Sequence, residues 1–197
     1  MNIKSLTLLS AATLALAGCG QKTDTTDASV NTTTVSETDT MNGTDAMNGT
    51  DTAMAPAAGQ TFANTAAASD AFEIATSKAA LATSKSASVK KFAQKMIDAH
   101  TQSTAKLKTI TAGLSPAITP DPTLTPDQQQ KLDALNKLTG ADFDKAYIDA
   151  QTAGHQQTLD ALKVYATGGD VPALKTFASG LVPIVTGHLN MAKGLKA

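Results

Sequence analysis

The sequence predicts an all-α protein, a four-helix bundle with a short extra helix between the second and third long helices. Three observations predict this fold. From residue 61 onward the apolar side chains recur at three- and four-residue steps, which is the period of an α-helix. Residue types that begin and end helices separate these periodic stretches. No stretch alternates between apolar and polar residues as a half-buried strand does, and residues 61–197 are numerous enough for one hydrophobic core.

Two long helices are predicted before a proline-rich loop. The first begins at Thr61 and meets no Pro or Gly as far as Lys85. The segment Ser86–Ser88 offers an N-cap, and a periodic apolar face then predicts a second helix from Ala87 to Ala112. Because the connection is so short, we expect these two helices to form an antiparallel hairpin.

Three more helices are predicted after the loop. Thr125 and Gln128 form a capping box with Pro at the first helical position, and the short helix that follows should stop at Gly140. A third long helix carries Phe143 to Tyr165 and ends at the glycine pair 168–169. Asp170 should cap the fourth long helix, in which Pro172 occupies the first turn and Pro183 predicts a kink.

Residues 1–18 have the pattern of a bacterial lipoprotein signal peptide. Lys4 precedes an apolar stretch, Leu6–Ala17, that is shorter than the roughly 20 residues needed to span a bilayer. The segment Leu16-Ala17-Gly18-Cys19 resembles a lipobox, and such proteins are cleaved before a Cys that then carries lipid. A conventional secretory signal followed by a chance Cys is the alternative. Cys19 is the only Cys, so lipidation would explain an odd thiol in an exported chain. Gly20 after the Cys is typical of sorting to the outer membrane, with the domain facing the periplasm.

Residues 19–60 are predicted to form a disordered linker. They are rich in Thr and Asp and contain almost no large apolar side chains, so they cannot bury enough surface to offset the entropy of ordering. A repeat within this segment places three thioethers at Met41, Met47 and Met54. Soft sulfur ligands suit Cu(I), but a duplicated spacer is the favoured interpretation. The linker would let the domain of residues 61–197 stand clear of the membrane.

The composition argues against a nucleic-acid partner and gives no sign of an enzyme. All sixteen basic residues are Lys, so no guanidinium is present for bidentate contacts with phosphate or guanine. There is no Trp and there are only seven other aromatic residues for stacking on bases. No nucleophile elbow, phosphate-binding loop or metal-binding Cys pair occurs.

The three histidines are the candidate site residues. His100, His155 and His188 each fall within an apolar helical stripe and each follows Ala or Gly. Counting residues from the turns places Glu73 and His100 at one level, about 20 Å from the first hairpin turn. The same count leaves His155 and His188 offset by about 7 Å, which a kink at Pro183 could reduce.

Two hypotheses follow for this polar layer. Glu73 and the three histidines could bind a transition metal such as Zn, Cu or Fe, because bundle cores are where such sites are built. Alternatively, three buried and hydrogen-bonded histidines specify packing, and this interpretation is favoured on general grounds. Glu73 could instead lie at the edge of its helix and pair with Lys78 or Lys85. A carboxylate-bridged di-iron centre is not expected, because the positions three residues before the histidines hold no Glu but Ile97, Thr152 and Val185.

These spacings resemble those of the domain of unknown function 4142 family. The resemblance rests on motifs in all four long helices: Glu73-Ile74, then Val89-x-x-Phe92-Ala93-x-x-Met96-x-x-x-His100, then Phe143-Asp144-x-x-Tyr147 with His155, and finally Pro183 with His188-Leu189. It implies a ferritin-like four-helix bundle in a bacterial envelope protein and brings no established activity. Many members carry Asp directly before the second- and third-helix histidines, where this chain has Ala99 and Gly154, although Asp98 is close by.

The sequence thus predicts a lipid-anchored envelope protein, attached through Cys19, that acts as a non-catalytic binding or envelope-maintenance module. The alternative is a periplasmic metal-binding protein that uses the histidines of the bundle core.

Overall fold

The computed structural model describes residues 57–197, in which all regular secondary structure is α-helical. The five helices are α1 (Ala57–Thr83), α2 (Ala87–Ala112), α3 (Pro126–Leu135), α4 (Gly140–Gly168) and α5 (Pro172–Gly194). No strand occurs within the described range, so the predicted all-α class is confirmed. The predictions of a signal peptide, a lipidated Cys19 and a methionine repeat concern residues outside it, as does nearly all of the predicted linker.

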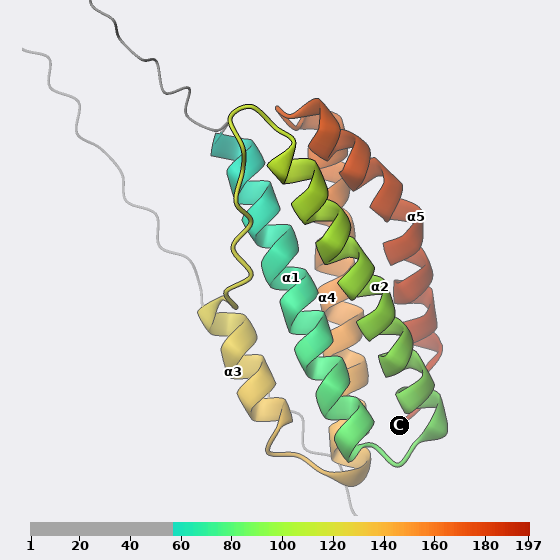
Figure 1. Ribbon diagram of the computed structural model, residues 1–197. Coiled ribbons are helices and arrows are strands. Elements are labelled where there is room, and N and C mark those ends of the chain that lie inside the picture. Colours follow the sequence, from blue (N-terminus) through green and yellow to red (C-terminus); the bar gives the residue numbers. More distant parts are fainter. Residues whose placement is uncertain (1–56) are drawn as a thin grey trace, which may run out of the picture. The chain divides into compact units, whose positions relative to one another are not determined.

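The four long helices lie side by side, and α3 lies outside them (Figure 1). The most extensive interfaces are those within the two hairpins, α1 with α2 and α4 with α5. The hairpins meet where α1 packs on α4 and α2 on α5, while α3 packs on α1 and α4. None of the described helices is both long and apolar enough to cross a membrane.

Two apolar clusters fill the interior toward opposite ends of the bundle. In one cluster the Phe62 ring stacks on Tyr165 with centroids 3.9 Å apart. In the other, Phe92 and Phe143 pack around Tyr147. Offset and edge-on aromatic pairs of this kind stabilise a core beyond the area that they bury. The histidines lie along their helices between the residues of these clusters, so a polar layer crosses the middle of an otherwise apolar core.

Two helix starts behave as predicted. The Ser86 hydroxyl accepts a hydrogen bond from the Val89 N–H, which caps α2. Thr125 and Gln128 form the reciprocal capping box at the start of α3, and Pro126 is its first residue. These side chains satisfy N–H groups that have no partner inside the helix.

Three predicted boundaries are wrong. Helix α1 begins at Ala57, four residues before the predicted helix start at Thr61, and ends at Thr83 rather than Lys85. Gly140 does not end the short helix, because α3 already stops at Leu135. Instead Gly140 is the first residue of α4, and its φ of 61° allows the chain to turn into that helix at a conformation that a side chain would strain.

The prediction that Asp170 caps α5 is also wrong. The N-cap position is held by Val171, which makes no side-chain cap bond. The Asp170 carboxylate instead accepts hydrogen bonds from the Tyr165 hydroxyl at 2.9 Å and from the Gly59 N–H at 3.3 Å. Gly59 lies in the first turn of α1, where backbone N–H groups lack helical partners and favour a negative charge. Asp170 therefore ties the α4–α5 turn to the start of α1.

Candidate metal centre

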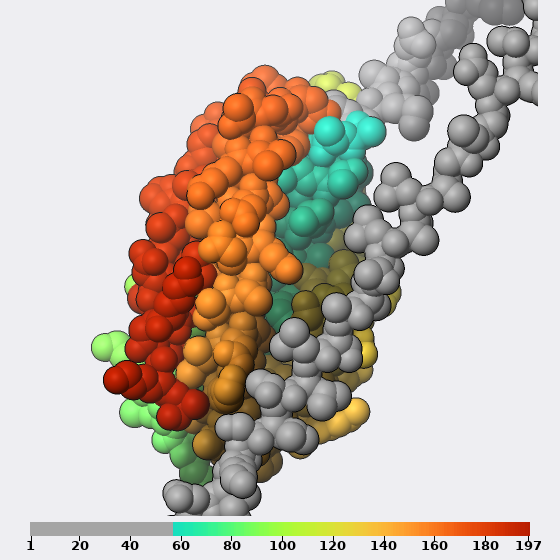
Figure 2. All heavy atoms as spheres, turned by 180° about the vertical axis from the view of Figure 1, so that it is seen from behind, coloured from blue at the N-terminus to red at the C-terminus, as the bar shows by residue number. Residues whose placement is uncertain are grey.

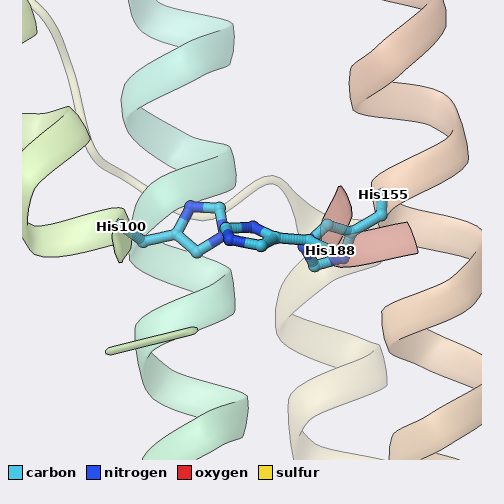
Figure 3. Close-up of side chains that lie close together, drawn as sticks. All are labelled: His100, His155 and His188. Atoms are coloured by element: carbon cyan, nitrogen blue, oxygen red, sulfur yellow. The ribbon is translucent and has the colours of Figure 1, made fainter. Parts of the chain in front are cut away.

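The structure brings all three histidines together in the middle of the bundle. His100 projects from α2, His155 from α4 and His188 from α5, and the rings face one another (Figure 3). Their ring centroids lie 5.5 to 5.8 Å apart in all three pairs. One ligand atom from each ring lies within 4.8 Å of the other two. The offset between His155 and His188 that residue counting predicts is therefore absent from the folded bundle.

The tautomer of His100 is fixed by a buried carboxylate. Its Nδ1 lies 2.8 Å from Asp70 Oδ1, and the Thr104 hydroxyl donates to the other oxygen of Asp70 at 3.1 Å. An ionised carboxylate only accepts hydrogen bonds, so Nδ1 must carry the proton. The lone pair of His100 is then on Nε2, which is buried and has no hydrogen-bond partner among the described residues.

A backbone carbonyl fixes the tautomer of His155 in the same way. Its Nδ1 lies 2.8 Å from the Gln151 carbonyl oxygen, which can only accept. The Nε2 atom therefore holds the lone pair, and it too is buried without a partner in residues 57–197. Partners of this kind, a carboxylate for one ring and a carbonyl for another, are what metal-ligating histidines commonly have on their second nitrogen.

Glu73 lies behind His155 and away from the point where the rings meet. One of its oxygens is 3.7 Å from His155 Nδ1, and the other accepts a hydrogen bond from the Gln151 side chain, which also donates to Thr76. Residue counting predicts that Glu73 lies at one level with His100, and the contact with His155 and the effect of the Glu73 charge on His100 agree with this prediction. The alternative in which Glu73 pairs with a lysine at the helix edge is wrong, because its side chain is buried in this network.

The three rings differ in their affinity for a proton. Burial, together with the neighbouring His155 and His100, lowers the pKa of His188 to about 3. Burial also lowers the pKa of His155, against the opposing charge of Glu73. For His100 burial acts in the same direction, but the Asp70 hydrogen bond and the charges of Glu73 and Asp70 outweigh it and raise its pKa. At neutral pH, His155 and His188 are therefore uncharged bases.

Each histidine of this layer has one buried ring nitrogen without a hydrogen bond, and this has an energetic cost. His100 Nε2, His155 Nε2 and His188 Nδ1 are all buried without a hydrogen bond in the described part of the chain. Leaving a buried polar atom unsatisfied costs about 1 to 3 kcal/mol. Histidines that serve packing alone are expected to have their buried ring nitrogens hydrogen-bonded. The Nδ1 atoms of His100 and His155 meet this expectation, but their Nε2 atoms do not.

The spacing of the rings is close to that of a tetrahedral metal site. Zinc–nitrogen bonds of about 2.0 to 2.1 Å place two ligating nitrogens about 3.3 Å apart. The ligand atoms here lie within 4.8 Å of one another, so each would move inward by less than about 1 Å to reach that geometry. Small rotations about the side-chain bonds cover such a distance without displacement of a helix.

Asp70 is the site residue that sequence reasoning missed. It is three residues before Glu73 and therefore on the same face of α1, in an Ala-rich stretch between Ala66-Ala67-Ala68 and Ala71-Phe72. A carboxylate in such a stretch was the signal that could have identified Asp70 as a buried residue of the layer. Asp98, the acid nearest to His100 in sequence, is exposed and accepts a hydrogen bond from Gln94, so it takes no part in the layer.

The small residues before the histidines have different explanations. A Cβ on Gly154 would lie 3.0 Å from Glu73 Oε1, so this glycine makes room for the buried carboxylate. A Cβ on Gly187 would meet nothing within 4 Å. Gly154 therefore gives space to Glu73 rather than to the His155 ring, and no neighbouring atom requires a glycine at position 187.

A cavity of about 620 Å³ borders the layer. Its wall includes Asp70, Glu73, His100 and His188, and the remainder is made of apolar side chains together with polar ones, among them the exposed Lys106 and Lys131. From the side shown in Figure 2, the surface is hollowed between α1 and α4, and residues of both helices line the cavity. The described structure therefore places two of the three imidazoles on the wall of a space much larger than one water molecule.

Comparison with known proteins gives one family. The family model described as "Domain of unknown function (DUF4142)" matches residues 44–195. No curated protein and no solved structure matches the chain.

Proposed function

From the premise that the chain belongs to the DUF4142 family, we propose that it is a lipid-anchored bacterial envelope protein whose helical bundle binds one divalent transition metal ion through His100, His155 and His188. Two observations carry the metal-binding proposal: one ring nitrogen of each histidine lies within 4.8 Å of the other two, and each histidine has a buried ring nitrogen without a partner among the described residues. Two of these nitrogens have their lone pairs fixed by contacts on the opposite side of the ring.

The charges around the rings fit a divalent cation. Asp70 and Glu73 are both buried beside the histidines, and each carries one negative charge when ionised. Buried charges are stable only when they are compensated. An ion of charge +2 bound to three neutral imidazoles balances the two carboxylates, whereas an uncompensated pair would have to draw protons onto the rings.

Zinc is the metal that this ligand set fits best. Imidazole nitrogen binds Zn, Cu, Fe and Ni, but Cu(II) prefers tetragonal geometry. Zn²⁺ has no geometric preference of its own and is commonly bound by three protein ligands and one further molecule. The three ring centroids form a near-equilateral triangle, an arrangement that suits three ligands at the base of a tetrahedron.

Metal analysis and unfolding measurements test the proposal. The protein purified from its native envelope should contain about one metal ion per chain. Zn²⁺ at a hundred times its Kd should stabilise the metal-free protein by about 2.7 kcal/mol, because the ion binds only the folded state. His155→Ala should abolish this stabilisation, and Asp98→Asn, which removes an exposed acid outside the layer, should retain it. A protein that carries no metal and melts at one temperature with Zn²⁺, Cu²⁺ or chelator is not a metal-binding protein.

The envelope address rests on the lipobox-like segment before Cys19. Two or more acyl chains anchor a protein stably, whereas one holds it only marginally. The wild-type protein expressed in a Gram-negative host should therefore fractionate with membranes and enter the detergent phase. Cys19→Ala should move it to the soluble fraction, and recovery of wild-type protein in the soluble fraction would contradict the anchor.

A further inference from the structure

We propose that the metal keeps one coordination position open toward the cavity, and that this position takes a small apolar molecule with a single uncharged nitrogen or sulfur donor. This inference rests on the proposed function, since it requires a metal at the three histidines. It adds a second binding partner, the ligand of the metal, and assigns its chemical class.

The open position follows from the ligands that the chain supplies. Among residues 57–197, the cluster of groups close enough to share an ion consists of the three histidines alone. The nearest acids lie on the other side of the rings: Asp70 contacts the Nδ1 of His100, and Glu73 lies near the Nδ1 of His155. A carboxylate held at Nδ1 cannot also reach a metal bound at Nε2 of the same ring. Three protein ligands leave one tetrahedral position for another molecule.

The cavity provides the space for that molecule. His100 and His188 form part of its wall, so an ion held between the rings borders the same space. A volume of about 620 Å³ is within the range of small-molecule sites and is far more than a bound water needs. Much of the wall is built from apolar side chains, among them Phe62, Ala66, Leu162, Leu181 and Val185. Such a wall favours a ligand whose body is apolar.

The buried acids determine the charge of the donor group. With a divalent ion in place, Asp70 and Glu73 already bring the layer to zero net charge. A neutral donor keeps that balance, whereas an anionic donor would add an uncompensated negative charge in a setting of low dielectric constant. The negative charges of the same two carboxylates oppose the ionisation of a metal-bound water to hydroxide. The layer is therefore poorly suited to hydrolysis by a metal-bound hydroxide.

The cobalt-substituted full-length protein tests the inference. Co²⁺ replaces zinc in tetrahedral sites, and its visible absorption changes when a ligand enters or leaves. We would titrate it with 1-butylimidazole, which is neutral and has an apolar chain, and with butyrate and azide, which are anions. Butylimidazole should change the spectrum and bind at least tenfold more tightly than unsubstituted imidazole. It should also bind at least tenfold more tightly than either anion.

A matched pair of variants tests the role of the cavity. Ile184 lines the cavity one helical turn before His188 and is 48 % exposed, whereas Val164 is 74 % exposed on α4 and does not line it. Ile184→Trp should weaken butylimidazole binding at least fivefold with Co²⁺ affinity unchanged. Val164→Trp, the same enlargement outside the cavity, should leave both affinities unchanged.

The outcomes separate the two proposals. If Co²⁺ and Zn²⁺ do not bind, the proposed metal site itself is absent. If Co²⁺ binds with a tetrahedral spectrum that none of these ligands alters, the site is closed and the further inference fails alone. It also fails if azide or butyrate binds more tightly than butylimidazole, or if the two tryptophan variants behave alike.

Discussion

Replacing Asp70 with Asn removes one charge from the polar layer while keeping its shape, and this makes Asp70→Asn the most informative single change. In the native protein Asp70 accepts from His100 Nδ1 at 2.8 Å and from the Thr104 hydroxyl at 3.1 Å. An asparagine oxygen facing His100 can still accept from Nδ1. Its NH₂ group then faces Thr104, whose hydroxyl can accept from it and donate to the His100 carbonyl oxygen at 2.9 Å. No hydrogen bond need be lost.

The expected effect is therefore electrostatic. A carboxylate on the second nitrogen of a ligating imidazole makes the ring a stronger base, and loss of such a partner typically costs 10- to 100-fold in metal affinity. That range corresponds to about 1.4 to 2.7 kcal/mol, at 1.36 kcal/mol for each factor of ten. Because Asp70 is only 5 % exposed and little water screens its charge, we expect the upper half of the range.

A competition titration measures this effect. The metal-free protein and a chromophoric chelator compete for Zn²⁺ at pH 7.5, and the ratio of wild-type to variant Kd gives the loss. Thr104→Ala is the control, because it removes one hydrogen bond to Asp70 and keeps the charge, so it should weaken Zn²⁺ binding less than fivefold. A Kd for Asp70→Asn within threefold of wild type would refute the reasoning, as would equal losses in the two variants.

Three further predictions concern stability. The pKa of His188 falls from its ordinary value of 6.5 to about 3, so below pH 6.5 the unfolded chain binds a proton that the folded protein refuses. The metal-free protein should therefore lose about 2 to 3 kcal/mol of unfolding free energy between pH 6.5 and pH 4, and His188→Gln should lose correspondingly less in urea titrations at each pH. Gly187→Ala should stabilise by about 0.5 to 1 kcal/mol through helix propensity, whereas Gly154→Ala should gain nothing, because its Cβ would crowd Glu73 at 3.0 Å; equal gains would contradict the assigned role of Gly154. Thr125→Ala should cost about 1 kcal/mol through loss of the capping box, and an unchanged urea midpoint would show that α3 adds nothing to global stability.

The local features of the fold are predictable from the sequence because they depend on neighbouring residues. The start of α2 follows from a serine that accepts from an N–H three residues later, and the start of α3 from the Thr125–Gln128 pair. Asp170 shows where such reasoning fails. A residue type that often caps helices stands in the expected place, but the Tyr165 hydroxyl and the Gly59 N–H offer it better partners. Gly59 is 111 residues away, and only the packing of α1 against the α4–α5 turn brings it there.

The sequence predicts that the polar layer is buried and roughly where it lies along the bundle, but not which of its side chains pair. Periodicity places the three imidazoles in the interior, and counting from the first hairpin turn places Glu73 beside His100. The pairing of Asp70 with His100 depends on the rotation of α1 about its axis, since a turn of one residue position would present another side chain. The level of His188 depends on how far α5 is displaced along the bundle, which residue counts from one turn do not determine. Both quantities are properties of helix packing.

The cost of the polar layer is itself an argument that it has a use. The apolar clusters on either side of it, around Tyr165 and Tyr147, show that these helices can be joined by ordinary hydrophobic packing. An apolar layer of similar volume in place of the polar one would remove several buried ionisable groups, a change that is often neutral or stabilising. The layer instead contains two buried acids, of which Asp70 fixes the tautomer of His100, and ring nitrogens that have no partner among the described residues. Packing specificity could explain paired groups, since a satisfied network fixes one arrangement of a core. It does not explain buried ring nitrogens that have no partner, whereas a cation between the three rings would take one nitrogen of each ring as a ligand.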